Sequence, residues 1–415
     1  MGKFFSDEVE KALELIYYKL GEQRGKEGLA LLETAHQNGD GDATYLLSRC
    51  YSGPQYVWKY HGFPEDDDKV EQLIHESIRR GSAMGVLGAM RCGELDEQAL
   101  EEMPFANLKE AFQVIYEKAQ GGEPFCQYMV GNVYFWGDVL DIEEEEMQRR
   151  AGNKKAIQEF IVSANAEAVG WLEKAFAAGV YFAGNNLYEI YQNGNDGILP
   201  SKPEEAAKIP RRGAEYGYPT WQAGYGTDLE EAGNYEQAVY WWKQAYENGQ
   251  KSVCIRLGKA ASQGKGMAKD CKLAEKYFTE GLSEEDYGCY NRLGELYFYG
   301  GDGVPQNYAR AVELFEEARR RGSNWANDMH AAARIRGLGC AKDAALAKQL
   351  VEETDYSSDL KNYTLGVIYA QGLGVPQDIK KGVSYLDKAP NLEWAKEERA
   401  KYKRGLFKWT VVEYR

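Results

Sequence analysis

The sequence is poor in proline and histidine and has no long apolar run. Its 415 residues include 11 prolines and 4 histidines. So few histidines make a histidine-rich metal site hard to build, and no H-E-x-x-H motif occurs. The sequence contains no apolar stretch of about 18 residues, the length that a helix needs to cross a bilayer. Asp7, Glu8 and Glu10 stand where a signal peptide needs apolar residues. We therefore expect a cytoplasmic protein that does not associate with a membrane.

The cysteines and the charge exclude further classes. The seven cysteines form no C-x-x-C pair and have no spacing typical of a zinc site. We expect them to be structural thiols in a reducing compartment, with no bound metal and no cofactor. The formal net charge of −15 disfavours nucleic acid as a partner, because phosphates need a basic surface. The same charge favours solubility and a basic protein partner.

Glycine, in contrast, is abundant. The chain has 45 glycines, about 11% of its residues against a usual value of ~7%. A glycine inside a helix costs ~1 kcal/mol relative to alanine. The glycine content therefore argues against helices, unless the glycines lie at helix ends or at close helix contacts.

A repeat of about 36 residues places these glycines. The residues Leu293, Gly294, Tyr297 and Gly300 recur with the same spacing as Leu365, Gly366, Tyr369 and Gly372. Both stretches continue with Gly-Val-Pro-Gln and an amphipathic run. Weaker copies occur along the chain, and in each one the spacing predicts two helices. Most glycines then fall at helix ends or next to the leucine, where the two helices of a pair approach closely.

These motifs resemble the Sel1-like repeat family, a branch of the tetratricopeptide superfamily. The resemblance covers roughly residues 40–390 and is most specific over 250–390. It implies an all-α fold: a right-handed superhelical solenoid of about ten stacked antiparallel helix pairs. It also implies that the protein works as an adaptor that holds partners together and does no chemistry.

The repeat predicts three regions. Residues 1–39 are expected to form a degenerate helix pair that caps the N-terminus, 40–390 the solenoid, and 391–415 a C-terminal capping helix and tail. The spacing widens by some 20 residues at about 138–163, which predicts a helical or acidic insertion. This insertion is either a solvated decoration or part of a binding face. The tail is either a cap for the last apolar face or a docking segment.

No catalytic constellation is evident. Ser358 and Lys361 match an S-x-x-K pattern, but the S-D-N and K-T-G motifs that accompany it in serine hydrolases are absent. Ser358 is better placed as the N-cap of a repeat helix. We therefore predict no catalytic residues, no metal ligands and no enzymatic activity.

The first helix of each pair lines the concave face in tetratricopeptide-type stacks, so its unanchored positions are the candidate partner-binding residues. Phe135-Trp136 and Phe298-Tyr299 occupy the same repeat position, and aromatic side chains with polar neighbours are typical of binding hot spots. Asn132, Asn185 and Asn291 could clamp an extended peptide backbone, because an amide side chain offers both a donor and an acceptor. The predicted concave-face residues are Arg49, Tyr128, Asn132, Trp136, Asn185, Glu189, Asn193, Asn291, Glu295 and Tyr299.

The sequence therefore predicts a non-catalytic scaffold that binds a protein or peptide on its concave face. One alternative is an acidic inhibitor or immunity-type protein that blocks a basic partner. A hydrolase with a site at the acidic insertion is the third interpretation. The sequence identifies neither the partner nor the oligomeric state.

Overall fold

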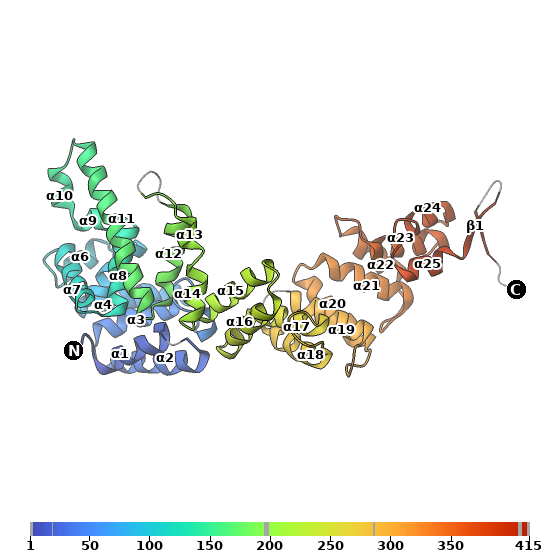
Figure 1. The fold of residues 1–415 in the computed structure, drawn as a ribbon, viewed down its shortest axis with the longest axis horizontal. Helices are drawn as coiled ribbons and strands as arrows, with labels where there is room; N and C mark the ends of the chain where they lie inside the picture. The colour runs from blue at the N-terminus through green and yellow to red at the C-terminus, as the bar shows by residue number, and fades with distance from the viewer. Residues whose placement is uncertain (1–2, 19, 195–198, 285–286, 406–408, 413–415) are drawn as a thin grey trace. The chain divides into compact units, whose positions relative to one another are not determined.

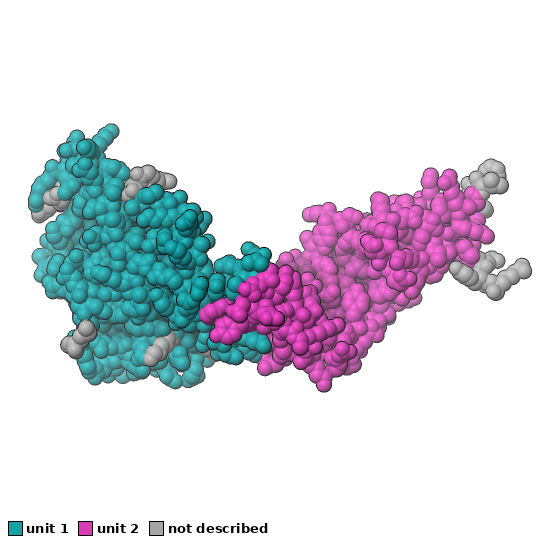
Figure 2. Space-filling view, viewed as in Figure 1, with its two compact units in different colours: residues 1–232, 243–250 teal, residues 233–242, 251–415 magenta. Residues whose placement is uncertain are grey.

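The structure is a computed structural model that describes residues 3–18, 20–194, 199–284, 287–405 and 409–412. The chain divides into two compact units (Figure 2). Unit 1 comprises residues 1–232 and 243–250, and unit 2 comprises 233–242 and 251–415. About 70% of the chain is helical, and each unit is a stack of helix pairs (Figure 1). The predicted all-α solenoid of helix pairs is confirmed.

Unit 1 begins with a two-helix segment and continues through successive pairs. Its elements are α1 (Asp7–Leu13), the π-helix η1 (Glu14–Tyr18), α2 (Glu22–Gln37), α3 (Gly41–Tyr51), the 3-10 helix η2 (Lys59–His61), α4 (Asp67–Arg79), α5 (Ala83–Cys92), α6 (Glu97–Glu102), α7 (Leu108–Gln120), α8 (Pro124–Phe135), α9 (Val139–Ile142), α10 (Glu144–Arg149), α11 (Lys154–Ala177), α12 (Tyr181–Asn193), α13 (Pro203–Ala206), α14 (Ile209–Glu215) and α15 (Pro219–Glu231).

Unit 2 repeats the same arrangement more regularly. Helix α16 (Tyr235–Glu247) contributes its first eight residues to unit 2 and the others to unit 1. The further elements of unit 2 are the 3-10 helix η3 (Lys251–Val253), α17 (Cys254–Gln263), α18 (Cys271–Glu280), the 3-10 helix η4 (Gly281–Ser283), α19 (Gly288–Tyr299), α20 (Tyr308–Arg320), α21 (Asn324–Arg336), α22 (Ala344–Glu352), α23 (Asp359–Gln371), α24 (Ile379–Leu386), α25 (Glu393–Arg399), β1 (Tyr402–Arg404) and β2 (Trp409–Val411).

Local chemistry explains where these short helices begin and end. Helix α23 begins after Ser358, whose hydroxyl accepts a hydrogen bond from the Lys361 backbone N–H and so acts as the predicted N-cap. It ends at Gly372, whose φ of +72° is left-handed and is disfavoured for other residues. Asp378 caps the next helix in the same way, so both helices of this pair begin at a residue of the repeat itself.

The glycines after the repeat leucine lie where the helices of a pair touch. A Cβ on Gly258 would meet the Phe278 ring of the partner helix at 2.3 Å, and one on Gly294 would meet Phe315 at 2.5 Å. Such distances are too short for real carbon contacts, so only glycine lets the two backbones approach this closely. The expected role of these glycines in close packing is confirmed. Gly88 differs, because its Cβ would meet Tyr45 of the neighbouring first helix α3.

The core of each unit lies between its helix layers. Unit 1 buries a continuous cluster that runs from Phe5 to Tyr218. Within unit 2, one apolar cluster surrounds Phe298 and Phe315, and another surrounds Ile368 and Val383. No helix among the described residues is both long and apolar enough to cross a bilayer.

The regions that depart from the repeat have their own elements. Helices α9 and α10 and the first turns of α11 occupy the range 138–163, and α11 continues without a break into the second helix of its pair. Helix α25 and the antiparallel strands β1 and β2 follow the last pair, with Tyr402 opposite Val411. The division into a cap, a solenoid and a tail stays a prediction.

Candidate partner-binding surface

The candidate surface is the one that the first helices of successive pairs present, and we call it the first-helix face. In unit 1 it is formed by α3, α5, α8 and α12, and in unit 2 by α17, α19, α21 and α23. The ten predicted residues lie on these helices or at their ends. Their exposure differs sharply between positions, so each group is described in turn.

Arg49 and Tyr128 are buried, with 8% of each residue exposed. The Arg49 Nε donates to the Tyr17 hydroxyl at 3.1 Å, and Nη1 donates to the Tyr45 hydroxyl at 3.2 Å. The guanidinium also lies 5.0 Å from the Tyr56 ring centre, within the range of a cation–π interaction. Arg49 and Tyr128 therefore belong to the core of unit 1 and not to a partner-binding surface, which corrects the prediction.

The N-terminal segment, Phe4–Tyr18, causes this burial. The Tyr17 ring centre lies 4.7 Å from that of Phe125 on α8 and 6.5 Å from that of Phe182 on α12. The Tyr18 hydroxyl donates to the Glu123 carboxylate at 2.9 Å. Figure 1 shows this segment and α2 (blue) running beside α3. The segment thus covers part of the first-helix face of its own unit.

The burial of this segment changes the acid–base behaviour of its groups. Desolvation raises the pKa of both Tyr17 and Tyr18, and for Tyr18 the Glu123 carboxylate raises it further. Desolvation lowers the pKa of His61, whose Nε2 lies 2.8 Å from the Ile16 carbonyl oxygen. Both tyrosines therefore stay protonated near pH 7, and they hold the segment in place through hydrogen bonds to the charged Arg49 and Glu123 side chains.

The predicted asparagine clamp is only partly available. Asn132 accepts a hydrogen bond from Asn186 at 2.5 Å. Asn291 donates to the Ser323 hydroxyl at 2.9 Å and accepts from it at 3.1 Å. Asn132 and Asn291 thus bind neighbours inside the fold, and their role in a backbone clamp stays a prediction. Asn185 is half-buried, and its role stays a prediction.

The polar residues at the exposed end of α12 and on α19 pair locally. Asn193 donates to the Glu189 carboxylate at 2.8 Å, and both residues are exposed. Glu295 forms an ion pair of 2.8 Å with Arg292, one turn earlier on α19. Exposed pairs of this kind contribute little to stability, about 0.3–0.5 kcal/mol on a helix. Their side chains can therefore change partners at low cost.

Two predicted aromatic residues are exposed. Trp136, at the end of α8, is 52% exposed, and Tyr299, at the end of α19, is 55% exposed. The preceding Phe298 is only 1% exposed, and Phe135 is half-buried. The repeat therefore places one aromatic ring in the core and the next in solvent at both positions.

The two exposed rings have different neighbours. The Arg91 guanidinium lies 4.6 Å from the Trp136 ring centre and forms an ion pair of 2.9 Å with Asp138. Partial burial and the nearby Glu295 carboxylate raise the pKa of Tyr299, so its hydroxyl remains a hydrogen-bond donor at neutral pH. Each ring therefore combines an apolar face with adjacent charge, as binding hot spots do.

A second covering element is helix α25, in the region where the sequence predicted a capping helix, but its position on the first-helix face was not predicted. Its Trp394 ring centre lies 5.8 Å from that of Phe298 and 4.4 Å from the Arg336 guanidinium. Gln371 donates to Glu398 at 2.7 Å. Burial alone would raise the pKa of Glu398, but hydrogen bonds from Lys401, Gln371 and Tyr402 lower it. Helix α25 therefore lies on the first-helix face of unit 2 and leaves Tyr299 exposed.

The stacked pairs define the class of the protein: an all-α helical-repeat protein. A family model described as Sel1 repeat matches five stretches of the chain, so these stretches are similar to Sel1 repeats. The matched residues are 164–180, 223–250, 252–283, 289–323 and 362–389.

Solved structures of low sequence identity were also found. A protective antigen of uropathogenic Escherichia coli that displays an SLR fold has 20% identity and a TM-score of 0.44, over 90% of this chain and 89% of that chain. A Sel1 repeat protein from Oxalobacter formigenes has 22% identity and a TM-score of 0.42, over 57% and 98%. An immunity protein from Pseudomonas aeruginosa has 19% identity and a TM-score of 0.29, over 45% and 71%. No curated protein sequence matches the chain.

Proposed function

We propose that the protein is a non-catalytic scaffold that binds a protein partner through the exposed parts of its first-helix faces. Sel1 and tetratricopeptide-like repeat proteins generally mediate protein–protein interactions. The observation that carries the proposal is the exposure of Trp136 and Tyr299 at equivalent repeat positions. Large aromatic rings dominate binding energies when a partner desolvates them.

The contacts of α25 with the first-helix face of unit 2 support this proposal. In unit 2, α25 contacts the first-helix face through the Trp394 ring, an ion pair between Arg336 and Glu397 at 3.8 Å, and the hydrogen bond between Gln371 and Glu398. An aromatic anchor with flanking charges is also how an amphipathic helix binds in a groove. The partner is proposed to use the same chemistry beside the residues that α25 leaves exposed.

The test is affinity purification with single variants of the full chain. Trp136→Ala and Tyr299→Ala are compared with Tyr240→Ala, a matched control because Tyr240 is 51% exposed but lies on the second helix α16. We expect a partner that is retained by the wild-type protein and by Tyr240→Ala, and lost or weakened at least tenfold by one of the other two variants. Retention by all three variants would refute the proposed surface.

The inhibitor alternative has a separate signature. A partner held mainly by the net charge of −15 would be released by salt, because the Debye length falls from about 10 Å at 0.1 M to about 3 Å at 1 M. Capture that is abolished by salt but unchanged by Trp136→Ala and Tyr299→Ala would favour the acidic inhibitor that blocks a basic partner.

The cytoplasmic location is also a proposal. Cys92 is a free, exposed thiol, which suits a reducing compartment. Cell fractionation with antibody detection would test it, and recovery of the protein outside the cytoplasm would contradict it.

A further inference from the structure

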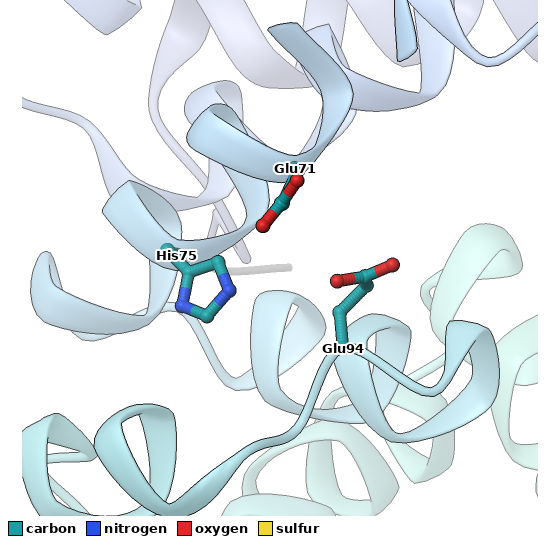
Figure 3. A group of neighbouring side chains, drawn as sticks. All are labelled: Glu71, His75 and Glu94. Carbon is teal, nitrogen blue, oxygen red and sulfur yellow. The ribbon is translucent and has the colours of Figure 1, made fainter. Parts of the chain in front are cut away.

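Three side chains that can bind a metal ion lie together in unit 1. Glu71 and His75 lie on α4, and Glu94 follows the end of α5. One ligand atom from each residue lies within 4.8 Å of the other two. Figure 3 shows the imidazole ring of His75 and the two carboxylates turned toward one another across the gap between the two elements.

The backbone explains why these residues meet. Glu71 and His75 are four residues apart on α4, so they lie on the same side of the helix. Helix α5 ends at Gly93, whose φ of +78° turns the chain, and the Glu94 N–H then donates to the Ala89 carbonyl at 2.9 Å. This hydrogen bond belongs to the closing turn of α5 and fixes the position of Glu94.

Helices α4 and α5, which carry these residues, are both packed into the core of unit 1. Helix α4 buries Ile74 and Ile78 and presents Glu71 and His75 at the surface. Helix α5 packs against α4 and buries Met84 completely. The three ligands therefore project from elements whose spacing is set by packing, and only their side chains need to move to close around an ion.

The two carboxylates of this cluster bring negative charge close together. Among the described residues, neither Glu71 nor Glu94 forms an ion pair with a lysine or arginine. The nearby Glu102 is already occupied, because it accepts from Arg79 at 3.2 Å and from Gln98 at 3.0 Å. Two unpaired carboxylates that face one histidine favour a divalent cation.

We propose that Glu71, His75 and Glu94 bind a divalent transition-metal ion, with Zn²⁺ as the best match. Zinc combines one imidazole nitrogen with carboxylate oxygens at bond lengths of about 2.0–2.2 Å. Calcium and magnesium instead prefer sites made only of oxygen ligands. Three protein ligands leave a fourth tetrahedral position for water. The charge of the ion balances the two carboxylates.

The site would connect α4 to the chain that follows α5. A metal ion that binds only the folded state stabilises it in proportion to its concentration and affinity. The ion would therefore stabilise the first repeats of unit 1 without taking part in the exposed aromatic surface. No sequence motif indicates this arrangement, because Glu94 is distant in sequence from His75.

The test is calorimetric titration of the full, metal-free chain with Zn²⁺ alone at neutral pH. We expect one ion per chain and a higher melting temperature in its presence. His75→Ala and the isosteric Glu94→Gln should each weaken binding at least tenfold and remove the thermal shift. The matched controls are Glu101→Gln, an exposed acid on α6, and Cys92→Ser, which removes the nearest exposed thiol in sequence; both should bind as the wild type does.

Three further readouts separate a built site from adventitious binding. Co²⁺ should give the visible absorption bands of tetrahedral coordination in the wild type and not in His75→Ala. Ca²⁺ should give no thermal shift. Binding should weaken in acid, because a histidine coordinates metal only in its neutral form. Unchanged Zn²⁺ affinity in both His75→Ala and Glu94→Gln, or several weak equivalent ions per chain, would overturn the proposal.

Discussion

The two units differ in how the chain's own ends cover their first-helix faces. In unit 1, the N-terminal segment inserts Tyr17, which is 1% exposed, between residues of α3, α8 and α12. In unit 2, α25 lays the half-buried Trp394 over residues of α19, α21 and α23. The helix pairs beneath are built alike, so the difference lies in the covering elements.

This comparison shows that repeat position alone does not decide which residues a partner can reach. Arg49 and Tyr299 both lie near the ends of first helices, yet Arg49 is buried and Tyr299 is exposed. The covering element decides the outcome. Changes to the covering elements should therefore affect the two units unequally, whereas changes to the helix pairs should affect them alike.

The largest effect is expected for Tyr17→Ala. The substitution removes a buried ring and one hydrogen-bond acceptor of Arg49, so the free energy of unfolding of unit 1 should fall by about 3–5 kcal/mol. Hydrogen exchange measured by mass spectrometry would show faster exchange in α3, α8 and α12. Unchanged protection there would show that the N-terminal segment does not stabilise unit 1.

The next largest effect is expected for acid, which should destabilise unit 2 through His330. Burial lowers the pKa of His330 in unit 2 to about 4, from a usual value of 6.5. Between these values the unfolded state binds the proton and the folded state does not, so stability falls as the pH drops from about 6.5 to 4, by up to about 3 kcal/mol. Urea unfolding at pH 7 and pH 4.5 would measure this loss for unit 2.

The control for this prediction is His330→Gln, which cannot titrate. The Arg334 Nε donates to the His330 Nε2 at 3.0 Å, so the native histidine is neutral at that atom. The variant should lose the part of the pH dependence that His330 causes. An identical pH profile in wild type and variant would assign the acid sensitivity to other groups. In unit 1, burial also lowers the pKa of His61, so protonation of His61 destabilises that unit in the same direction.

Substitutions of the contact glycines should act equally in both units. Gly258→Ala in unit 2 places a Cβ 2.3 Å from Phe278, and Gly131→Ala in unit 1 places one 2.7 Å from Leu172. Each should cost about 1–3 kcal/mol through overpacking, measured by urea unfolding. The matched control is Gly170→Ala, since Gly170 lies inside α11 and a Cβ added there would have no neighbouring atom within 4 Å. It should stabilise its helix by about 0.5–1 kcal/mol.

The smallest effect is expected for Trp394→Ala. The ring is half-buried and stacks on Arg336, so its loss should cost about 1–2 kcal/mol, less than Tyr17→Ala. Exchange of α25 amides should rise while that of α19 and α23 changes little. A cost equal to that of Tyr17→Ala would contradict the difference between the two covering elements.

The sequence predicted the fold well because the repeat is a local signal. Leucine, glycine and tyrosine at fixed spacing, with Ser358 and Gly372 at the helix ends, suffice to identify short paired helices. The prediction is strongest over 250–390, which contains three of the five matched Sel1 stretches. The earlier repeats are more divergent, and the matched stretches begin at residue 164.

The candidate site was less predictable. Trp136 and Tyr299 are exposed, as the sequence predicted, because the preceding residues Phe135 and Phe298 take the inward positions. Arg49, Tyr128, Asn132 and Asn291 were assigned to a groove from repeat position alone, and each has a partner or a cover inside the fold. Pattern matching to a repeat cannot register a segment outside the repeat that folds back onto it.

The sequence by itself therefore determined the helices, their pairing and the glycines that let them touch, since these depend on residues close together in the chain. Only the tertiary structure decided which first-helix residues reach solvent and that Glu71, His75 and Glu94 converge. Both outcomes depend on contacts between distant segments. These contacts depend on how the helix pairs stack and on how the N-terminal segment and α25 pack against them. The local spacing of residues in the sequence does not predict them.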